Sequence, residues 1–359
     1  MQFAEAGSAP SLIPELRYYD MPTVRKEFET SPQFFTPNVT NNLQTRLNNE
    51  KRAKESVYGA YVMGGVQLNR LGILAGIRVE ETRIKGEGNV QQLTPAEQAR
   101  RAAWVGPVTV EESLRRIQAQ YGNFREASSE YRNVFPGVHF RYDLREGLVG
   151  RASYSTSIGR PNFNTIIPND SVNYESQIVT ANNSGLRPQY ANNFDLALEY
   201  YFEPMGVVSA GVFLKEISDF LYQGDAGIIP PGSDNGFAGE YAGFDLRTQL
   251  NGGFARVRGI ELNYQQQFSN LTGFWRGFGV YANLTFLDTK GNYGIGGTVT
   301  QSQLAGFETK TASMGISYTA RRWSIRLQRT YNGVSKQAIQ ANPTNQRFNR
   351  STKPIDLNA

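Results

Sequence analysis

The stretch 251–264 constrains the fold more than any other part of this chain. It opens with an Asn-Gly-Gly turn signal, after which Ile260, Leu262 and Tyr264 alternate with polar residues. A two-residue period makes a β-strand that is apolar on one face and polar on the other. The pattern recurs from about residue 56 onward in segments of roughly ten or more residues, whereas strands of soluble proteins usually have about 5–6 residues. It therefore predicts strands long enough to cross a lipid bilayer at a tilt.

The composition limits the kinds of protein that the chain can be. A mean hydropathy of −0.46 and the lack of a long apolar run exclude transmembrane helices. They are compatible with a membrane barrel, because its strands bury only alternate residues in lipid. The absence of Cys among 359 residues excludes disulfide scaffolds, zinc–thiolate sites and thiol nucleophiles. The net charge of +5 is spread out and forms no basic helix, so no nucleic-acid partner is expected.

The strand candidates form pairs joined by short turns, and long polar segments separate one pair from the next. The pairs are 56–68 with 71–84, 134–143 with 148–160, 192–202 with 207–222, 253–268 with 278–288, and 309–320 with 323–332. The long segments are 85–132, 161–190, 223–251, 290–308 and 333–352. An antiparallel barrel in an outer membrane has this asymmetry, with tight turns on one rim and long extracellular loops on the other. The predicted fold class is all-β, a partial transmembrane β-barrel meander of about ten or eleven strands.

The alternation also predicts which residues point outward. Phe140, Leu198, Ile260 and Ile316 belong to the apolar sets of their strands, so we expect them on one exposed face that contacts lipid. The alternative is a soluble two-sheet sandwich, in which a second sheet would bury the same four side chains.

The segment 85–132 differs from the other loops because it predicts two short helices. Thr94 and Thr109 are each followed three residues later by Glu, which is the capping-box pattern, and Pro95 suits a first helical position. A DNA-binding helical hairpin is the alternative, but no basic recognition face follows. Residues 1–55 are expected to be a loop region before the first strand, and 56–359 to form the barrel.

Five motifs resemble elements of the barrel of TonB-dependent receptors and occur in the order expected for that family. They are G-I-R-V-E-E-T at 76–82 after the strand at 58–63, S-I-G-R-P at 157–161, D-L-A-L-E-Y-Y-F at 195–202 after the segment 183–188, V-F-L-K-E-I-S-D-F at 212–220, and V-R-G-I-E-L at 257–262. The resemblance covers residues from about 50 to 359. It implies a segment from the second half of a barrel of roughly 22 strands.

The resemblance does not extend to that family's N-terminal plug, its energy-coupling box or its last strands. Residues 1–7 also lack the basic and apolar regions of a signal peptide, so we interpret the chain as an internal or C-terminal barrel fragment. The implied function is active uptake of a scarce solute across the bacterial outer membrane, driven by a TonB complex that pulls the plug. The implied protein is not an enzyme. The alternative is a passive porin or a β-barrel adhesin without energy coupling.

Ionisable residues on the polar sides of the strands predict a hydrogen-bonded network in the barrel lumen that holds a plug. Its members are Arg78, Glu80, His139, Arg141, Asp143, Arg151, Asp195, Glu199, Glu261 and Arg326. Catalysis is the alternative, but His139 and Asp143 are four residues apart in a strand, about 13 Å, which is too far for a catalytic dyad.

The loops carry aromatic residues that could stack on a sugar ring or a siderophore. They are Phe163, Tyr174, Tyr190, Tyr222, Phe237, Tyr241 and Tyr293, and packing within the loops is the alternative for each. The Gly-rich segment 291–297 lacks the Lys and the following helix of a phosphate cradle. The acidic residues of the segment 223–251 lack EF-hand spacing, so neither a metal nor a cofactor is expected.

The loop composition slightly favours a neutral oligosaccharide over an anionic ferric siderophore. Tyr and Phe are mixed with Asn, Gln and Asp, which hydrogen-bond hydroxyl groups, and the basic residues are not clustered. Arg160, Arg187, Arg347 and Arg350 are evidence for the anion. The expected partners are outer-membrane lipid, the TonB complex and this small-molecule or oligosaccharide substrate.

Overall fold

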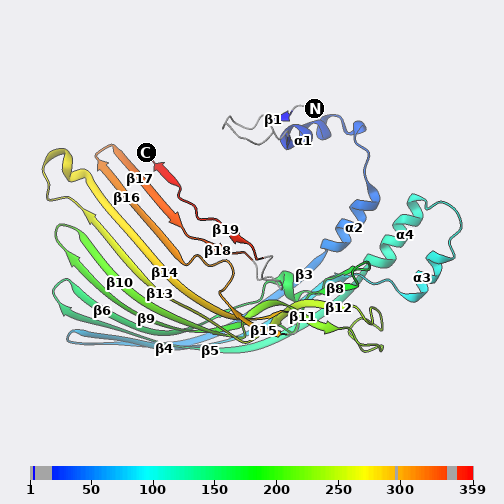
Figure 1. Cartoon of the computed structure of the whole chain (residues 1–359), viewed down its shortest axis with the longest axis horizontal. Coiled ribbons are helices and arrows are strands. Elements are labelled where there is room, and N and C mark those ends of the chain that lie inside the picture. Colours follow the sequence, from blue (N-terminus) through cyan, green and yellow to red (C-terminus); the bar gives the residue numbers. More distant parts are fainter. Residues whose placement is uncertain (1–2, 5–17, 296–297, 338–345, 359) are drawn as a thin grey trace.

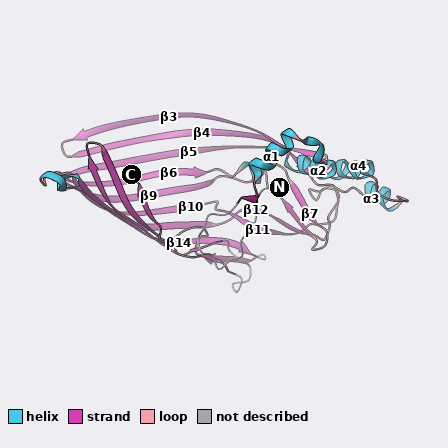
Figure 2. Ribbon diagram, turned by 90° about the horizontal axis from the view of Figure 1, so that it is seen from above, coloured by secondary structure: helices cyan, strands magenta, loops and turns pink. Residues whose placement is uncertain are grey.

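The computed structural model describes residues 3–4, 18–295, 298–337 and 346–358. A long, strongly curved antiparallel sheet dominates it (Figures 1 and 2). The strands of this sheet are β3 (Lys51–Leu68), β4 (Leu71–Val90), β5 (Asn123–Arg145), β6 (Leu148–Gly159), β9 (Gln189–Phe202), β10 (Gly206–Ser218), β13 (Phe254–Gln267), β14 (Phe278–Ile295), β15 (Thr298–Ser302), β16 (Lys310–Ala320), β17 (Trp323–Asn332) and β20 (Ile355–Asn358). Apart from β15, which pairs with β14, each strand lies beside the preceding one, so the predicted meander is confirmed.

The two ends of the sheet differ as predicted. Short turns join the strands of each hairpin at one end, where the longest connection contains the 3-10 helix η2 (Gly273–Gly277) (Figure 1). The long segments all emerge at the other end and form smaller elements, namely α3 (Pro95–Ala102), α4 (Val110–Tyr121), α5 (Phe163–Ile166), β7 (Asp170–Asn173), β8 (Ile178–Ala181), β11 (Leu221–Ile228), β12 (Asp245–Asn251), β18 (Ser335–Lys336) and β19 (Phe348–Asn349). We call these two ends the turn rim and the loop rim.

Several strand boundaries differ from the prediction, including those of β4, β5 and β10. β4 continues six residues past 84, and β5 begins at Asn123 instead of 134, because the two pair in register through Lys85 and Ser128. Charged residues lie on both faces of this extension, so its sequence does not alternate between apolar and polar residues. The predicted strand 207–222 is divided at Asp219, whose φ of 53° breaks the extended backbone between β10 and β11.

The expectation that residues 1–55 are loop-like is wrong for the described part of that region. It contains the short pairing of β1 (Phe3–Ala4) with β2 (Tyr18–Tyr19), the helix α1 (Met21–Thr30), the 3-10 helix η1 (Pro32–Phe34) and the helix α2 (Val39–Asn49), and β3 already begins at Lys51. The side chain of Asn38 caps α2 by accepting the N–H of Asn41, and Leu47 is buried. Such a cap is a signal that the sequence carries. No helix in the described residues is long and apolar enough to span a membrane.

The register places the apolar residues of successive strands side by side. One row runs through direct cross-strand partners, in the order Phe140, Ala152, Leu196, Val212, Ile260 and Phe286. We call the side that carries this row the apolar face and the opposite side the polar face. Phe140, Leu198, Ile260 and Ile316 are 40%, 48%, 48% and 51% exposed, so no second sheet covers them in the described structure. The predicted exposed apolar face is confirmed and the sandwich is excluded.

Aromatic side chains mark the turn rim of the apolar face. The rings of Phe274 and Tyr318 are 4.6 Å apart, and those of Phe278 and Tyr318 are 5.0 Å apart. Trp323, at the neighbouring turn, is 68% exposed. Such aromatic belts are typical of membrane–water interfaces.

The core of the molecule lies between the loops and the polar face. Ile167 and Pro168 pack directly over Gly86 and Gly88 of β4, where a Cβ atom on Gly88 would lie 1.9 Å from the carbonyl oxygen of Pro168. Glycine at these positions lets the β6–β9 loop descend onto the sheet. Buried Leu304 packs in the same manner against the polar face of β13. The long loops therefore fold inward over the polar face.

Candidate functional site

Two loops combine into a small second sheet at the loop rim. Its strand order is β11-β12-β8-β7, and β12 pairs with β8 in parallel through residues 245–247 and 178–180. The β6–β9 loop supplies β7 and β8, and the β10–β13 segment supplies β11 and β12. We call this unit the loop sheet. It lies where the long strands end, beside the α3–α4 hairpin (Figure 1).

An aromatic cluster covers the loop sheet. It consists of Tyr174, Phe237, Tyr241 and Phe244, whose ring centroids are 5.8–6.2 Å apart. Phe237, Tyr241 and Phe244 pack on the buried side chains Val179, Ala181 and Ile229. Burial raises the pKa of the Tyr241 hydroxyl, and the neighbouring Tyr174 hydroxyl raises it further. This phenol is therefore neutral and can donate a hydrogen bond at any physiological pH.

Hydrogen bonds fasten the connection between β11 and β12 of the loop sheet to the residues that follow β4. The hydroxyl of Tyr241 donates to the carbonyl oxygen of Gln91 over 3.1 Å. The Glu240 carboxylate accepts the backbone N–H of Leu93 at 3.2 Å. The backbone of Tyr241 has a φ of 59°, a conformation that non-glycine residues adopt only when surrounding contacts hold it. These two bonds provide such contacts.

An ion pair fastens the loop sheet to β5. The guanidinium of Arg125 donates to both carboxylate oxygens of Asp170 at 3.0 Å. The Asp170 side chain is only 2% exposed. Burial raises the pKa of this carboxyl, and the charge of Arg125 opposes that rise. The pair is neutral as a unit and holds the first strand of the loop sheet over the polar face.

These contacts enclose a pocket of about 450 Å³ that we call the rim pocket. Its functional side chains come from four parts of the chain and are Gln91, Asn123, Arg125, Asp170, Phe237 and Tyr241. Amide groups, a neutralised ion pair and two aromatic rings thus line one hollow. Amides donate and accept hydrogen bonds with hydroxyl groups, and aromatic faces stack on apolar ring surfaces.

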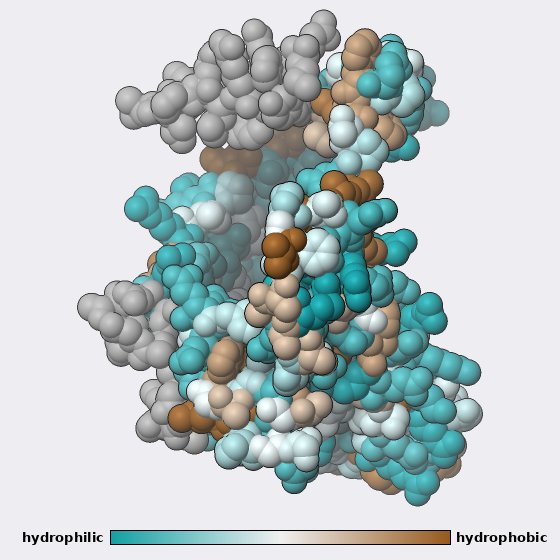
Figure 3. All heavy atoms as spheres, turned by 90° about the vertical axis from the view of Figure 1, so that its right-hand side faces the viewer, coloured by the Kyte–Doolittle hydropathy of each residue, from teal (hydrophilic) through white to brown (hydrophobic). Residues whose placement is uncertain are grey.

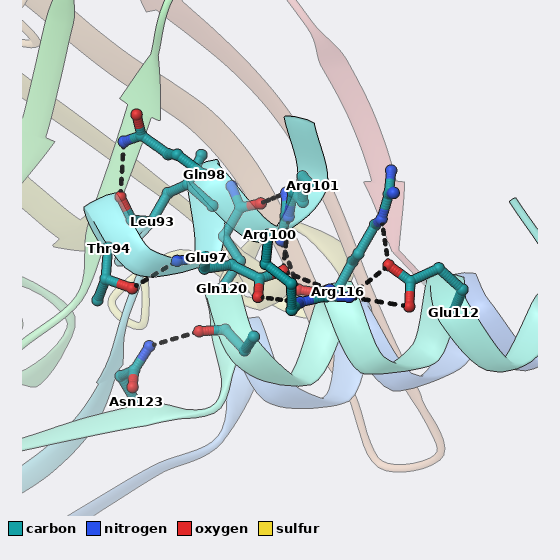
Figure 4. Close-up of polar contacts among 11 residues, drawn as sticks. Leu93, Thr94, Glu97, Gln98, Arg100, Arg101, Glu112, Arg116, Gln120 and Asn123 are labelled. Carbon is teal, nitrogen blue, oxygen red and sulfur yellow. Dashed lines mark hydrogen bonds and ion pairs between the residues drawn. The ribbon is translucent and has the colours of Figure 1, made fainter. Parts of the chain in front are cut away.

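The α3–α4 hairpin next to the rim pocket is held together by charge. Arg100 bonds Glu97 and Glu112, while Arg101 bonds Glu97 and the side chain of Gln120 (Figure 4). The hydrogen bond from Arg100, followed by that from Arg101, lowers the pKa of Glu97 to about 2. These charges pair within the hairpin, and the surface at this end of the molecule is mainly hydrophilic (Figure 3).

The two helices begin where the sequence predicts. Thr94 accepts the N–H of Glu97, and Thr109 accepts the N–H of Glu112, each at 3.2 Å. Both predicted caps are therefore confirmed.

Comparison with known proteins assigns the fold to a family. The model of the TonB-dependent receptor-like β-barrel family matches residues 12–358. This chain belongs to the TonB-dependent receptor family. The family consists of outer-membrane transporters and receptors and not of enzymes, so the predicted outer-membrane localisation is confirmed.

Solved receptors share this fold at low sequence identity. The ferric-catecholate import receptor Fiu of E. coli K12 is 16% identical with a TM-score of 0.54, and the match covers 86% of this chain and 38% of Fiu. The siderophore receptor PiuA of Acinetobacter baumannii is 14% identical with a TM-score of 0.54, covering 86% and 37%. The ferric enterobactin receptor PfeA of Pseudomonas aeruginosa is 14% identical with a TM-score of 0.53, covering 86% and 46%. The chain thus spans less than half of each receptor. No curated protein matches its sequence significantly.

In this receptor barrel, the register puts all ten residues of the predicted lumen network on the polar face. Their contacts form separate groups instead of one network. The ion pairs are Arg78–Glu80 at 2.7 Å, Arg141–Asp143 at 3.1 Å and Arg151–Glu199 at 3.0 Å, and Ser153 donates to Asp195 at 3.2 Å. Arg326 lies 5.8 Å from the ring of Tyr281, whereas His139 and Glu261 make no hydrogen bond or ion pair within the described residues.

The structure brings three of the predicted ligand-binding aromatics together, since Tyr174, Phe237 and Tyr241 form the aromatic cluster. Phe163 begins α5, is 41% exposed and does not line the rim pocket. Tyr222 packs against the buried residues of β13. The side chain of Tyr293 lies outside the described part.

Tyr190 is separated from the other aromatics. It has the parity of Phe194 in β9, so it lies on the apolar face, where its hydroxyl donates to the carbonyl oxygen of Val134 at 2.9 Å. The sequence carries this signal, because Tyr190 is an even number of residues before Phe194 in the same strand. Sequence reasoning also missed Arg125 and Asp170, which are 45 residues apart on different elements and carry no local signal.

Proposed function

We propose that this chain forms part of an active importer that takes up a scarce solute across the outer membrane when an inner-membrane TonB complex pulls on a plug in the lumen. Family membership supports the transport role. The ionisable residues on the polar face support contact with a plug, because His139 and Glu261 have no hydrogen-bond or ion-pair partner within the described residues and can bind a second surface.

We further propose that the rim pocket binds a neutral oligosaccharide. The observation that carries this proposal is the Arg125–Asp170 pair, which supplies hydrogen-bonding groups without net charge beside the rings of Phe237 and Tyr241. A pyranose ring stacks on such rings and offers hydroxyl groups to amides and ion pairs.

The arginines that argued for an anionic ferric siderophore support it less in the structure. Arg160 bonds Glu80 at 2.8 Å, and Arg187 bonds Asp219 at 2.6 Å, so neither offers a free charge. Arg347 and Arg350 are exposed, but they do not line the rim pocket. The local electrostatics therefore favour a neutral ligand.

Binding measurements on the full-length receptor test this proposal. A panel of neutral oligosaccharides and a panel of ferric siderophores are titrated by calorimetry. We expect an oligosaccharide to bind, and Phe237→Ala to weaken that binding about tenfold or more because a stacking surface is lost. Phe163→Ala is the matched control, since this exposed aromatic lies outside the rim pocket. Submicromolar binding of a ferric siderophore without any response to oligosaccharides contradicts the proposed ligand.

Transport is tested separately in cells. Uptake of the bound solute should stop when the TonB gene is deleted, whereas a passive porin or adhesin would be unaffected. Nothing in the comparisons favours a porin.

A further inference from the structure

The apolar face carries a groove whose loop-rim end is basic. A pocket of about 700 Å³ runs across β9, β10, β13, β14 and the start of β16. Phe194, Leu196, Val212, Ile260 and Phe286 line it, and they are between 43% and 58% exposed. Arg256, Arg258 and Lys310 also line it. Because the register places these three on the same face as the apolar residues, they point outward and not into the lumen.

The positions of the basic residues match the level of a lipid headgroup. Arg258 is one outward-facing position from Ile260 toward the loop rim, and Arg256 is the next, so they lie about 7 and 13 Å beyond Ile260. Lys310 lies directly opposite Phe286. The aromatic belt marks the other edge of the apolar face at the turn rim. The basic groups therefore lie where the apolar band ends on the side of the long loops.

These basic charges are only partly compensated. Arg258 pairs with Asp288 at 2.7 Å. Arg256 and Lys310 form no ion pair within the described residues. Arg256 lies directly opposite Lys290 on one side and Glu216 on the other, so like charges face each other across β13 and β14. Opposed like charges destabilise a sheet unless an anion lies between them.

The outward charges of β3 to β5 are arranged differently. Arg132 bonds Glu81 at 2.8 Å, and Arg52 lies 3.6 Å from Glu87. Lys54 and Lys85 are opposite each other, but Lys85 lies six residues, about 20 Å, beyond the outward-facing Val79. A pocket of about 510 Å³ adjoins them, but charged and small residues line it and no large apolar side chain does. The combination of an apolar floor with a basic end that is only partly compensated is specific to the groove on β9 to β16 within the described sheet.

We propose that this groove binds one phosphorylated lipid of the outer leaflet, with its phosphate between Arg256, Arg258 and Lys310 and its acyl chains on the apolar residues toward the turn rim. The site is separate from the rim pocket and faces the opposite side of the sheet. A lipid satisfies both halves of the groove, because hydrocarbon covers the apolar side chains while the phosphate accepts charge-assisted hydrogen bonds.

The test uses the full-length receptor, purified and delipidated in detergent, and native mass spectrometry. The probes are bisphosphorylated lipid A, the same lipid without its phosphates, and inorganic phosphate. We expect one lipid A molecule to bind per receptor, with the dephosphorylated lipid binding about tenfold more weakly or worse and inorganic phosphate not binding.

Two triple variants separate this groove from general charge attraction. R256Q/R258Q/K310Q should weaken lipid A binding about tenfold or more, whereas K54Q/K85Q/R132Q, which removes the same outward charge from β3 to β5, should change it by less than about twofold. Equal losses in the two variants, or no loss in the first, overturn the proposal. A heat-dependent shift in gel mobility confirms folding. If the first variant does not fold, the wild-type comparison decides, and equal binding of lipid A with and without phosphates overturns the proposal.

Discussion

The guanidinium of Arg125 holds both carboxylate oxygens of Asp170 at 3.0 Å and so joins the longest strand of the barrel to the loop sheet. The two partners differ in exposure, since the Arg125 side chain is 40% exposed and that of Asp170 is 2% exposed. The pair therefore acts as a clamp in which water reaches the arginine on the strand but not the carboxylate on the loop sheet. This difference in exposure determines which of the two substitutions destabilises the loop sheet more.

Removing the arginine should cost more than removing the carboxylate. Arg125→Gln leaves a buried carboxylate without its counter-charge, and we expect it to destabilise the loop sheet by about 1–3 kcal/mol after allowance for the exposed side of the pair. Asp170→Asn leaves an arginine that water can reach, so the expected cost is smaller. Hydrogen exchange of residues 170–181 in the full-length receptor measures both. Equal effects of the two substitutions contradict this account of the clamp.

The α3–α4 hairpin should loosen in acid. Hydrogen bonds from Arg100 and Arg101 lower the pKa of Glu97 from 4.5 to about 2. A lowered carboxyl pKa contributes stability that is fully present above pH 4.5 and is lost as the pH falls through about 2. Hydrogen exchange of residues 95–121, corrected for the intrinsic rate at each pH, should show opening over this window. Glu97→Gln should loosen the hairpin at neutral pH and reduce the pH dependence, of which Glu112 keeps a share because Arg116 and Arg100 lower its pKa as well. Unchanged exchange in this variant argues against the role of Glu97.

The sequence predicts the barrel and the helix caps because both depend on local patterns. Alternation around Ile260 places a strand and its exposed face without reference to any partner, and Thr94 caps α3 through a residue three positions away. The loop sheet depends on long-range pairing. Residues 178–180 join 245–247 in parallel, and nothing within either segment encodes the other. The rim pocket was therefore found only in part, through its aromatic residues.

The descent of the β6–β9 loop onto β4 should depend on the absence of a side chain at Gly88. A Cβ atom there would lie 1.9 Å from the carbonyl oxygen of Pro168, so Gly88→Ala must displace the loop backbone, at a cost of about 1–3 kcal/mol. Gly64→Ala is the matched control, because no atom lies within 4 Å of its Cβ position. Limited proteolysis should cut the loop faster in Gly88→Ala alone. Equal cleavage of the two variants contradicts the packing described for Pro168.

Neighbouring residues of β13 should respond oppositely to the same charge, because they face lipid and lumen. Leu262 lies on the apolar face, is 39% exposed and is directly opposite Ala210 and Leu284. Asn263 lies on the polar face and accommodates polar neighbours, since its amide donates to Ser209 at 3.2 Å. Leu262→Arg buries a charge in hydrocarbon and should destabilise the barrel by about 2–4 kcal/mol. Asn263→Arg keeps its charge in the lumen and should cost less than about 1 kcal/mol.

Urea-dependent folding of the full-length receptor into phosphatidylcholine vesicles, followed by heat-dependent gel mobility, measures both values. A larger cost for Asn263→Arg than for Leu262→Arg means that the two faces are assigned the wrong way round, and the lipid groove on the apolar face then loses its basis as well.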